Sequence, residues 1–140
     1  MLLVPDKRVS IRKPSKKELS IISSLLTIAK SIECTQKVAA CAVGTKVLAT
    51  GTNSYKTHPL SVDARYNALH AEVDLVTNIR DLKNLTVYVA RLRVRGPGLA
   101  KPCKNCEEIL RKAGCQDVSF VVSQGWKDYE ENPLIADLKL

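Results

Sequence analysis

Residues 102–106 read Pro-Cys-Lys-Asn-Cys, and this stretch decides the fold that we expect for the chain. A helix is predicted to begin there, because apolar side chains follow at helical spacing and Gly114 provides a stop. Runs rich in β-branched residues lie before it at 85–90 and after it at 118–122, which predicts two strands. A strand, a helix and a strand in this order favour parallel pairing of the two strands.

Further elements are predicted on the N-terminal side of this unit. A helix should begin near Ser15, because Ser15 and Glu18 have the spacing of a capping box. Residues 37–43 and 46–50 are short β-rich runs with a hairpin signal between them. Another helix is predicted over 70–79, where apolar side chains gather on one side.

Three segments have weaker patterns. Residues 1–14 are expected to be extended or loosely held, and 91–102 form a basic loop that contains Gly and Pro. The last 17 residues fit a short helix, a fifth strand or both. The sequence therefore predicts an α/β fold with a mixed sheet of four to five strands and helices packed on its faces.

Length and composition fit a single domain over residues 1–140. Apolar residues make up 45% of the chain, which is enough for a core, whereas aromatic residues make up only 4%. We see no signal peptide and no stretch able to span a membrane. Five cysteines without the spacing of a disulfide framework suit a reducing cytoplasm. Cys34, Cys41 and Cys115 are expected to be small buried hydrophobes.

The net charge of +8 is concentrated near the N-terminus. The basic side chains there are Lys7, Arg8, Arg12, Lys13, Lys16 and Lys17. Such an edge either attracts phosphate-bearing partners, whether nucleotides or nucleic acid, or is a solvated surface. Arg93 and Arg95 present the same choice in the predicted loop, since they either hold a phosphate or line a solvated rim.

Three side chains have the chemistry and spacing of a zinc site. Cys103 and Cys106 lie three residues apart on a helix and so share one face, and His70 begins the other helix. Three N and S ligands suit Zn²⁺ and leave a fourth position for water. Glu72 is placed to take the proton of that water rather than to bind the metal. A zinc ribbon needs a second ligand pair, and a redox Cys-x-x-Cys leaves His70 and Glu72 unexplained.

His-x-Glu followed by Pro-Cys-x-x-Cys resembles the signature of the cytidine deaminase superfamily. The resemblance implies a three-layer cytidine-deaminase-like fold, zinc on the His and two Cys residues, and a proton shuttle at Glu72. Gly51-Thr52-Asn53 is similar to an element of that family whose Asn contacts substrate. The layout and the loop over 53–59 are similar to deoxycytidylate-deaminase-like proteins of phages, although Asp74 stands where nucleotide deaminases often carry Asn. The candidate substrate contacts are Asn53, His58, Ala71, Arg93 and Arg95.

The expected function is therefore that of a zinc-dependent hydrolase that deaminates the cytosine base of a free nucleotide of the dCMP type, giving the uracil product and ammonia. One alternative is a deaminase acting on cytosine or adenine in single-stranded DNA or RNA. The basic N-terminus favours that alternative, and the few aromatic residues disfavour it. Another is a non-catalytic zinc module that binds nucleic acid, for which Glu72 has no use. Assembly into a homo-oligomer is left open.

Overall fold

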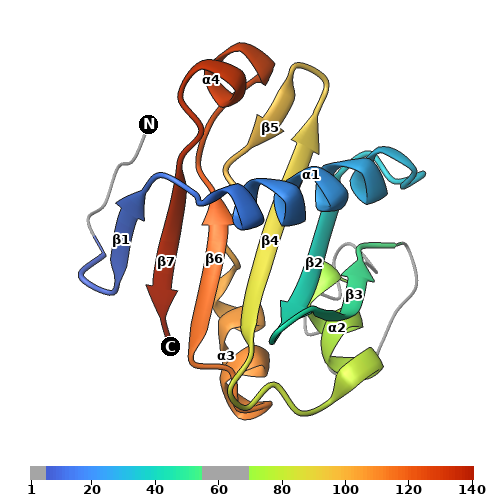
Figure 1. Ribbon diagram of the computed structural model, residues 1–140. Helices are drawn as coiled ribbons and strands as arrows, with labels where there is room; N and C mark the ends of the chain where they lie inside the picture. Colours follow the sequence, from blue (N-terminus) through green and yellow to red (C-terminus); the bar gives the residue numbers. More distant parts are fainter. Residues whose placement is uncertain (1–5, 55–69) are drawn as a thin grey trace.

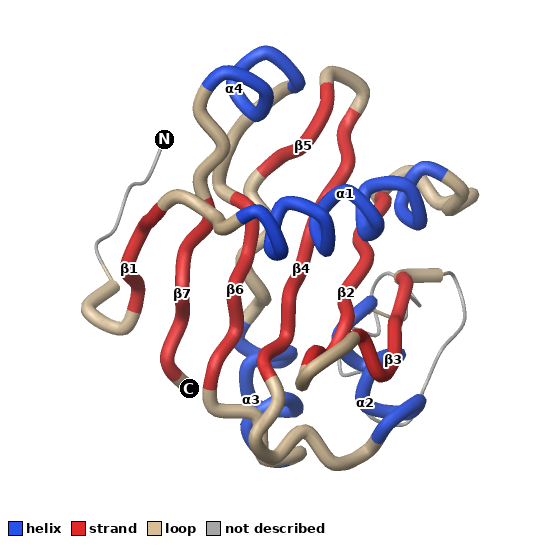
Figure 2. The backbone as a smooth tube through the Cα atoms, viewed as in Figure 1, coloured by secondary structure: helices blue, strands red, loops and turns tan. Residues whose placement is uncertain are grey.

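The computed structural model describes residues 6–54 and 70–140. Figure 1 shows a sheet with helices on both of its faces, and Figure 2 separates helices from strands by colour. The elements in chain order are β1 (Val9–Arg12), α1 (Lys16–Lys30), β2 (Lys37–Val43), β3 (Val47–Thr52), α2 (Ala71–Ile79), β4 (Thr86–Arg93), β5 (Gly96–Gly98), α3 (Lys104–Lys112), β6 (Asp117–Val121), α4 (Trp126–Glu131) and β7 (Ile135–Lys139).

The described strands form one mixed sheet in the order β1-β7-β6-β4-β2-β3, with β5 paired to β4. Strands β4 and β6 pair in parallel, as the strand-helix-strand order predicts, and the remaining pairs are antiparallel. The prediction of four to five strands was too low, because the sheet has seven strands among the residues that the structure describes. The predicted loop contains β5, whose Gly-Pro-Gly sequence has no β propensity of its own. The N-terminal segment contains β1, which pairs with β7 at the far edge.

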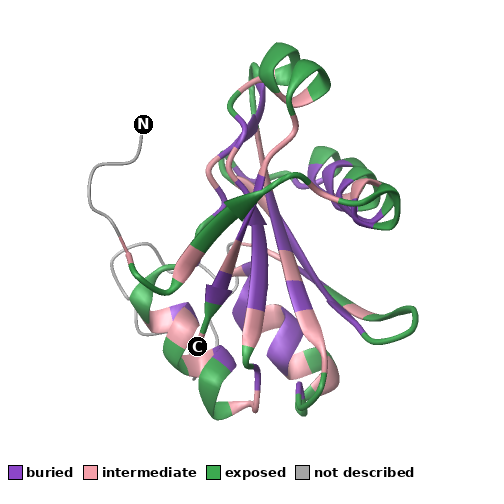
Figure 3. Ribbon diagram, turned by 60° about the vertical axis from the view of Figure 1, so that its left-hand side comes forward, coloured by how far each residue is buried: buried purple, intermediate pink, exposed green. Residues whose placement is uncertain are grey.

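The helices cover the two faces of the sheet in separate layers, so the predicted three-layer architecture is confirmed. Along β2, Ala39, Cys41 and Val43 pack against α1, while Ala40 and Ala42 pack in the core under α2 and α3. Figure 3 shows α1 on one side of the buried strands and α2 and α3 on the opposite side, while α4 lies beyond the end of the sheet. The two apolar faces of the sheet are therefore both covered.

The N-terminus of α1 has the predicted capping box. The backbone N–H of Glu18 donates to Ser15 Oγ at 3.2 Å, and the Ser15 N–H donates to Glu18 Oε1 at 2.9 Å. Glu18 also accepts two hydrogen bonds from Arg12, at 2.7 and 2.6 Å, and one from Tyr88 Oη at 2.8 Å. Arg12 binds Asp137 of β7 as well. This polar network ties β1 to both α1 and the sheet.

The C-terminal segment contains both of its predicted alternatives, a short helix and a strand, namely α4 and β7. Cys34, Cys41 and Cys115 are buried, with 8%, 1% and 2% of their surface exposed, which confirms their prediction as small buried hydrophobes. None of the described helices combines the length and the apolar character that crossing a membrane requires.

Candidate metal centre

The N-termini of α2 and α3 meet on the face of the sheet opposite α1. His70 is the N-cap of α2 and Cys103 is the N-cap of α3, both with extended backbones. Val73 of α2 packs against Cys106 and Ile109 of α3, which holds the two helices in contact. The His70 side chain makes no capping hydrogen bond to its own helix. Its ring instead faces the two cysteines.

Three ligand atoms converge at this point. Nδ1 of His70 lies 3.3 Å from Sγ of Cys106 and 3.7 Å from Sγ of Cys103, and all three atoms lie within 4.8 Å of one another. A tetrahedral zinc with bonds of about 2.3 Å to sulfur and about 2.0 Å to nitrogen separates N and S ligands by about 3.5 Å. The distances in the protein lie on either side of that value, so the group fits a zinc ion.

The two thiols share a hydrogen bond that makes their acidities unequal. The hydrogen bonds from Cys106 and from His70 lower the pKa of Cys103 to about 4. The same interaction with Cys103, together with burial, raises the pKa of Cys106. The Cys103 Sγ atom also accepts the backbone N–H of Cys106 at 3.4 Å, as expected for a thiolate at a helix N-terminus. A divalent cation would stabilise the second thiolate as well.

Glu72 lies in the first turn of α2 with only 5% of its surface exposed. Burial raises the pKa of this carboxyl group, and its hydrogen bonds are to its own backbone N–H and to the Cys106 thiol. A buried carboxylate beside a metal group of three ligands is placed to exchange protons with a molecule in the fourth position.

A chain of ion pairs that the sequence does not reveal holds the cysteine-bearing segment at both ends. Lys101 Nζ lies 3.3 Å from Asp6 Oδ2, and the same carboxylate oxygen accepts Arg8 Nη2 at 2.9 Å. Arg8 Nη1 then donates to Glu107 Oε1 at 2.9 Å. Lys101 precedes both cysteines and Glu107 follows them. This N-terminal ion-pair chain therefore contacts the cysteine-bearing segment on both sides of Cys103 and Cys106.

The Gly-x-Asn element lies where β3 meets α2. A Cβ atom on Gly51 would come within 2.4 Å of both the Ala71 carbonyl oxygen and the Leu75 amide nitrogen, so only Gly permits this approach. The Asn53 side chain accepts the Val38 N–H at 2.7 Å and donates to the Gln36 carbonyl at 2.7 Å. These bonds use two of the four hydrogen-bonding positions of the amide.

The remaining predicted substrate contacts fall in different places. Ala71 is fully buried at the start of α2, between the metal ligand and Glu72. Arg93 ends β4 with its aliphatic stem over Gly98, and Arg95 is exposed in the turn that follows. His58 lies outside the described residues. The four described positions therefore occur just after β3, on α2 and around the end of β4.

The fold and the convergent His, Cys and Cys side chains define a zinc-binding α/β domain of the hydrolytic kind. Residues 15–122 match the family model of the cytidine and deoxycytidylate deaminase zinc-binding region. The chain belongs to this family, and it is a zinc-dependent hydrolase. A comparison with curated proteins finds no significant match.

Proposed function

We propose that the protein deaminates the cytosine base of a free pyrimidine nucleotide of the dCMP type, with zinc held by His70, Cys103 and Cys106. The observation that carries this proposal is the buried Glu72 carboxylate next to a group of three ligands. Three ligands leave one tetrahedral position for a reacting molecule, whereas a structural site would fill it. A buried carboxylate beside that open position is expected where protons are transferred to or from the reacting molecule.

In this proposal Glu72 moves the protons of the reaction. His70, Cys103 and Cys106 would hold the zinc, which would act as a Lewis acid and make a water molecule beside Glu72 more acidic. Glu72 accepts a proton from that water and delivers it to ring nitrogen N3 as the water oxygen bonds to C4 of the base. Glu72 then transfers the second water proton to the exocyclic amine. The C4–N bond breaks, so that water and cytosine give uracil and ammonia.

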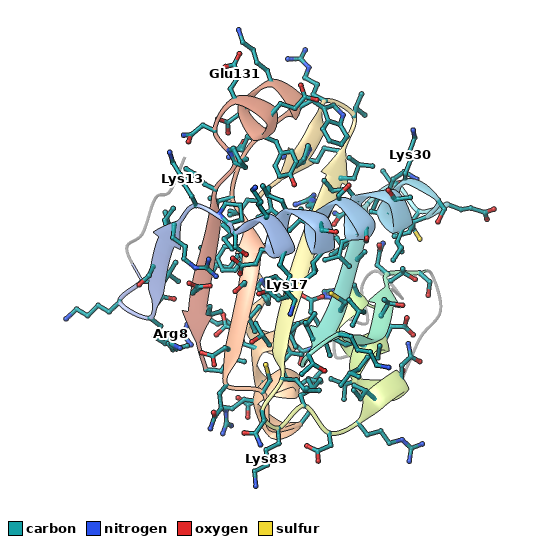
Figure 4. The ribbon with its side chains drawn as sticks, viewed as in Figure 1. Arg8, Lys13, Lys17, Lys30, Lys83 and Glu131 are labelled. Carbon is teal, nitrogen blue, oxygen red and sulfur yellow. The ribbon has the colours of Figure 1, made fainter. Side chains whose placement is uncertain are left out.

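The charge distribution supports a small substrate over a polymer. Arg8 and Arg12 belong to the basic edge noted in the sequence, yet both are engaged in intramolecular ion pairs. Figure 4 shows Arg8 and Lys13 beside β1 on one side of the molecule and Lys30 on the opposite side, so these three cations do not form one patch. Polymer binding requires several cations along one path. Arg93 and Arg95, both exposed, are the side chains that we assign to the phosphate.

One observation favours the second candidate, a deaminase acting on single-stranded DNA or RNA. Trp126 at the start of α4 is 43% exposed, and its backbone N–H donates to the Arg95 carbonyl at 2.9 Å. An exposed indole close to an arginine is a surface on which an unpaired base can stack. The same tip carries Val94, which is fully exposed. We rank this candidate second, because Asp128, Glu130 and Glu131 on the same helix oppose a polyanion.

A substrate panel tests both candidates. Cytidine, CMP, dCMP, dCTP, adenosine and short single-stranded oligonucleotides are compared by ammonia release at fixed salt concentration. We expect dCMP to have the highest kcat/KM, and deoxycytidine to show a higher KM because it lacks the phosphate. Faster deamination within an oligonucleotide than of any free nucleotide would promote the second candidate, and Trp126→Ala should then weaken binding of the oligonucleotide.

We also infer a reducing, cytoplasmic setting, since all five cysteines are free thiols.

A further inference from the structure

Strand β3 lies at one edge of the sheet, and side chains of α2 bind to its outer backbone groups. Asp74 Oδ2 accepts the Thr52 N–H at 3.0 Å, and Asn78 Nδ2 donates to the Thr50 carbonyl at 2.7 Å. Positions 74 and 78 lie one turn apart on the same side of the helix. Residues 50 and 52 point to the same edge of the strand. Two helical side chains therefore occupy positions that a neighbouring strand would otherwise fill.

The helix and the strand are in direct contact between these two hydrogen bonds. Gly51 lies against the backbone of α2 near Ala71 and Leu75, with no room for a Cβ atom. The contact fixes the distance between the two elements, while the Asp74 bond fixes the position of the strand end along the helix. Asp74 is thus the hydrogen-bonded contact nearest to the point where the chain leaves β3 toward Asn53.

A hydrogen bond between Asp74 and Thr52 connects the end of β3 to the turn of α2 that carries Glu72. Asp74 follows Glu72 by two residues in the first turn of α2, and Thr52 directly precedes Asn53. Asn53 in turn binds the backbone at the start of β2. A continuous set of contacts therefore leads from the helix that carries Glu72, through Asp74 and Thr52, to Asn53.

We propose that Asp74 is a positioning residue that sets the location of Asn53 relative to the metal-binding end of α2, and thereby the fit of the substrate. The inference rests on the proposed function, because that function places a substrate beside Asn53. The residue type is consistent with the role. An ionised carboxylate accepts a backbone N–H strongly, and its negative charge is favourable in the first turn of a helix. An Asn side chain can accept the same hydrogen bond through its carbonyl oxygen.

Three variants separate positioning from general stability. Asp74→Ala leaves the Thr52 N–H without its acceptor, Asp74→Asn keeps an acceptor of the same shape, and Asn78→Ala removes the neighbouring bond farther from Asn53. We expect Asp74→Ala to raise KM for the preferred nucleotide about tenfold, to change kcat little and to retain one zinc per chain. Asp74→Asn should restore KM to within about twofold, and Asn78→Ala should lower Tm without raising KM.

The proposal is overturned by an unchanged KM in Asp74→Ala, by an equal rise in Asp74→Asn, or by an equal rise in Asn78→Ala. If Asp74→Ala does not fold, Asp74→Glu replaces it in the test. This variant moves the acceptor by one methylene, and we expect it to raise KM as Asp74→Ala is expected to do.

Amide hydrogen exchange makes the test independent of catalysis. The Thr52 amide should exchange faster in Asp74→Ala than in the parent protein and should keep its protection in Asp74→Asn. Unchanged protection in Asp74→Ala overturns the positioning role even in an active enzyme. A parent protein that releases no ammonia from any substrate defeats the proposed function instead, so the two failures are distinguishable.

Discussion

Arg8 donates a hydrogen bond of 2.9 Å to Glu107, a residue 99 positions later in the chain. Because Glu107 directly follows Cys106, a predicted zinc ligand, this contact connects the N-terminal segment to the helix that begins at the two cysteines. Arg8→Ala should therefore release zinc to a chelator about two- to fivefold faster, a small effect because the pair is exposed. Release is followed with a colorimetric zinc indicator.

The matched control for this prediction is Arg111→Ala, which breaks the exposed pair with Glu108 farther along the same helix. It should leave zinc release unchanged. If zinc release were equally faster in both variants, the cause would be the change in net charge rather than the loss of the contact beside the cysteines.

Zinc binding itself should depend on each of the three converging side chains. The purified protein should contain about one zinc per chain, and Cys103→Ser or His70→Ala should lower that content steeply, because two ligands hold zinc poorly. Metal analysis by mass spectrometry measures the content. Cys115→Ser is the control, since that thiol is buried away from the group, and zinc retained in full by Cys103→Ser would remove Cys103 from the site.

Glu72→Gln should keep zinc and the fold but lose several orders of magnitude in kcat, because the amide has the shape of the carboxylate and cannot accept a proton. Steady-state ammonia release measures kcat, and zinc analysis together with circular dichroism verifies the protein. Glu108→Gln, an exposed position on the neighbouring helix that pairs with Arg111, is the control. Near-normal turnover in Glu72→Gln is incompatible with a proton shuttle at this residue.

Phosphate recognition should depend on the exposed arginines around the end of β4. Neutralising Arg93 and Arg95 together should raise KM for dCMP and change the slower reaction of deoxycytidine little, because only the former substrate carries the phosphate. The ratio of the two kcat/KM values is the measurement. An equal loss for both substrates would show that these side chains act on the fold instead.

The network around Glu18 should make stability depend on acid pH. The hydrogen bond from Arg12, together with those from the Ser15 backbone and Tyr88, lowers the pKa of Glu18 from 4.5 to about 2. The stabilisation is therefore complete above pH 4.5 and is lost as the pH falls toward 2. Glu18→Gln should reduce the free energy of unfolding at neutral pH by about 1–3 kcal/mol and flatten its decline in acid.

Urea unfolding at a series of pH values measures this dependence. Glu130→Gln on the exposed side of α4 is the control and should leave the curve unchanged. If the free energy of unfolding depended on pH in the same way in the Glu18 variant and the parent protein, the assigned role of the network would be contradicted.

Local signals predicted the elements whose causes are local. The capping box at Ser15 and the helix starts at His70 and Cys103 depend on a few adjacent residues, and the structure has all three where the sequence placed them. Strand β5 could not be predicted, because Gly96–Gly98 becomes a strand only through pairing with β4. Propensity carries no information about such a partner.

The metal group was predictable for a different reason. Its residue types are rare in this combination, lie at predicted helix starts and resemble the signature of a known family. The contacts that support the group are long-range and involve common residues. The bonds from Asp74 to Thr52 and from Arg8 to Glu107 join positions 22 and 99 apart, and a single sequence offers no pattern that pairs them.

His70 and Cys103 are separated by 33 positions, and the chain between them includes β4 at the centre of the sheet. An ion bound to both residues closes that segment into a ring, as a covalent cross-link would. Because the ion binds the native arrangement and not the dispersed ligands of the unfolded chain, each increase in free zinc adds to the free energy of unfolding. The durability of this enzyme in a cell is thus set partly by the supply of zinc around it.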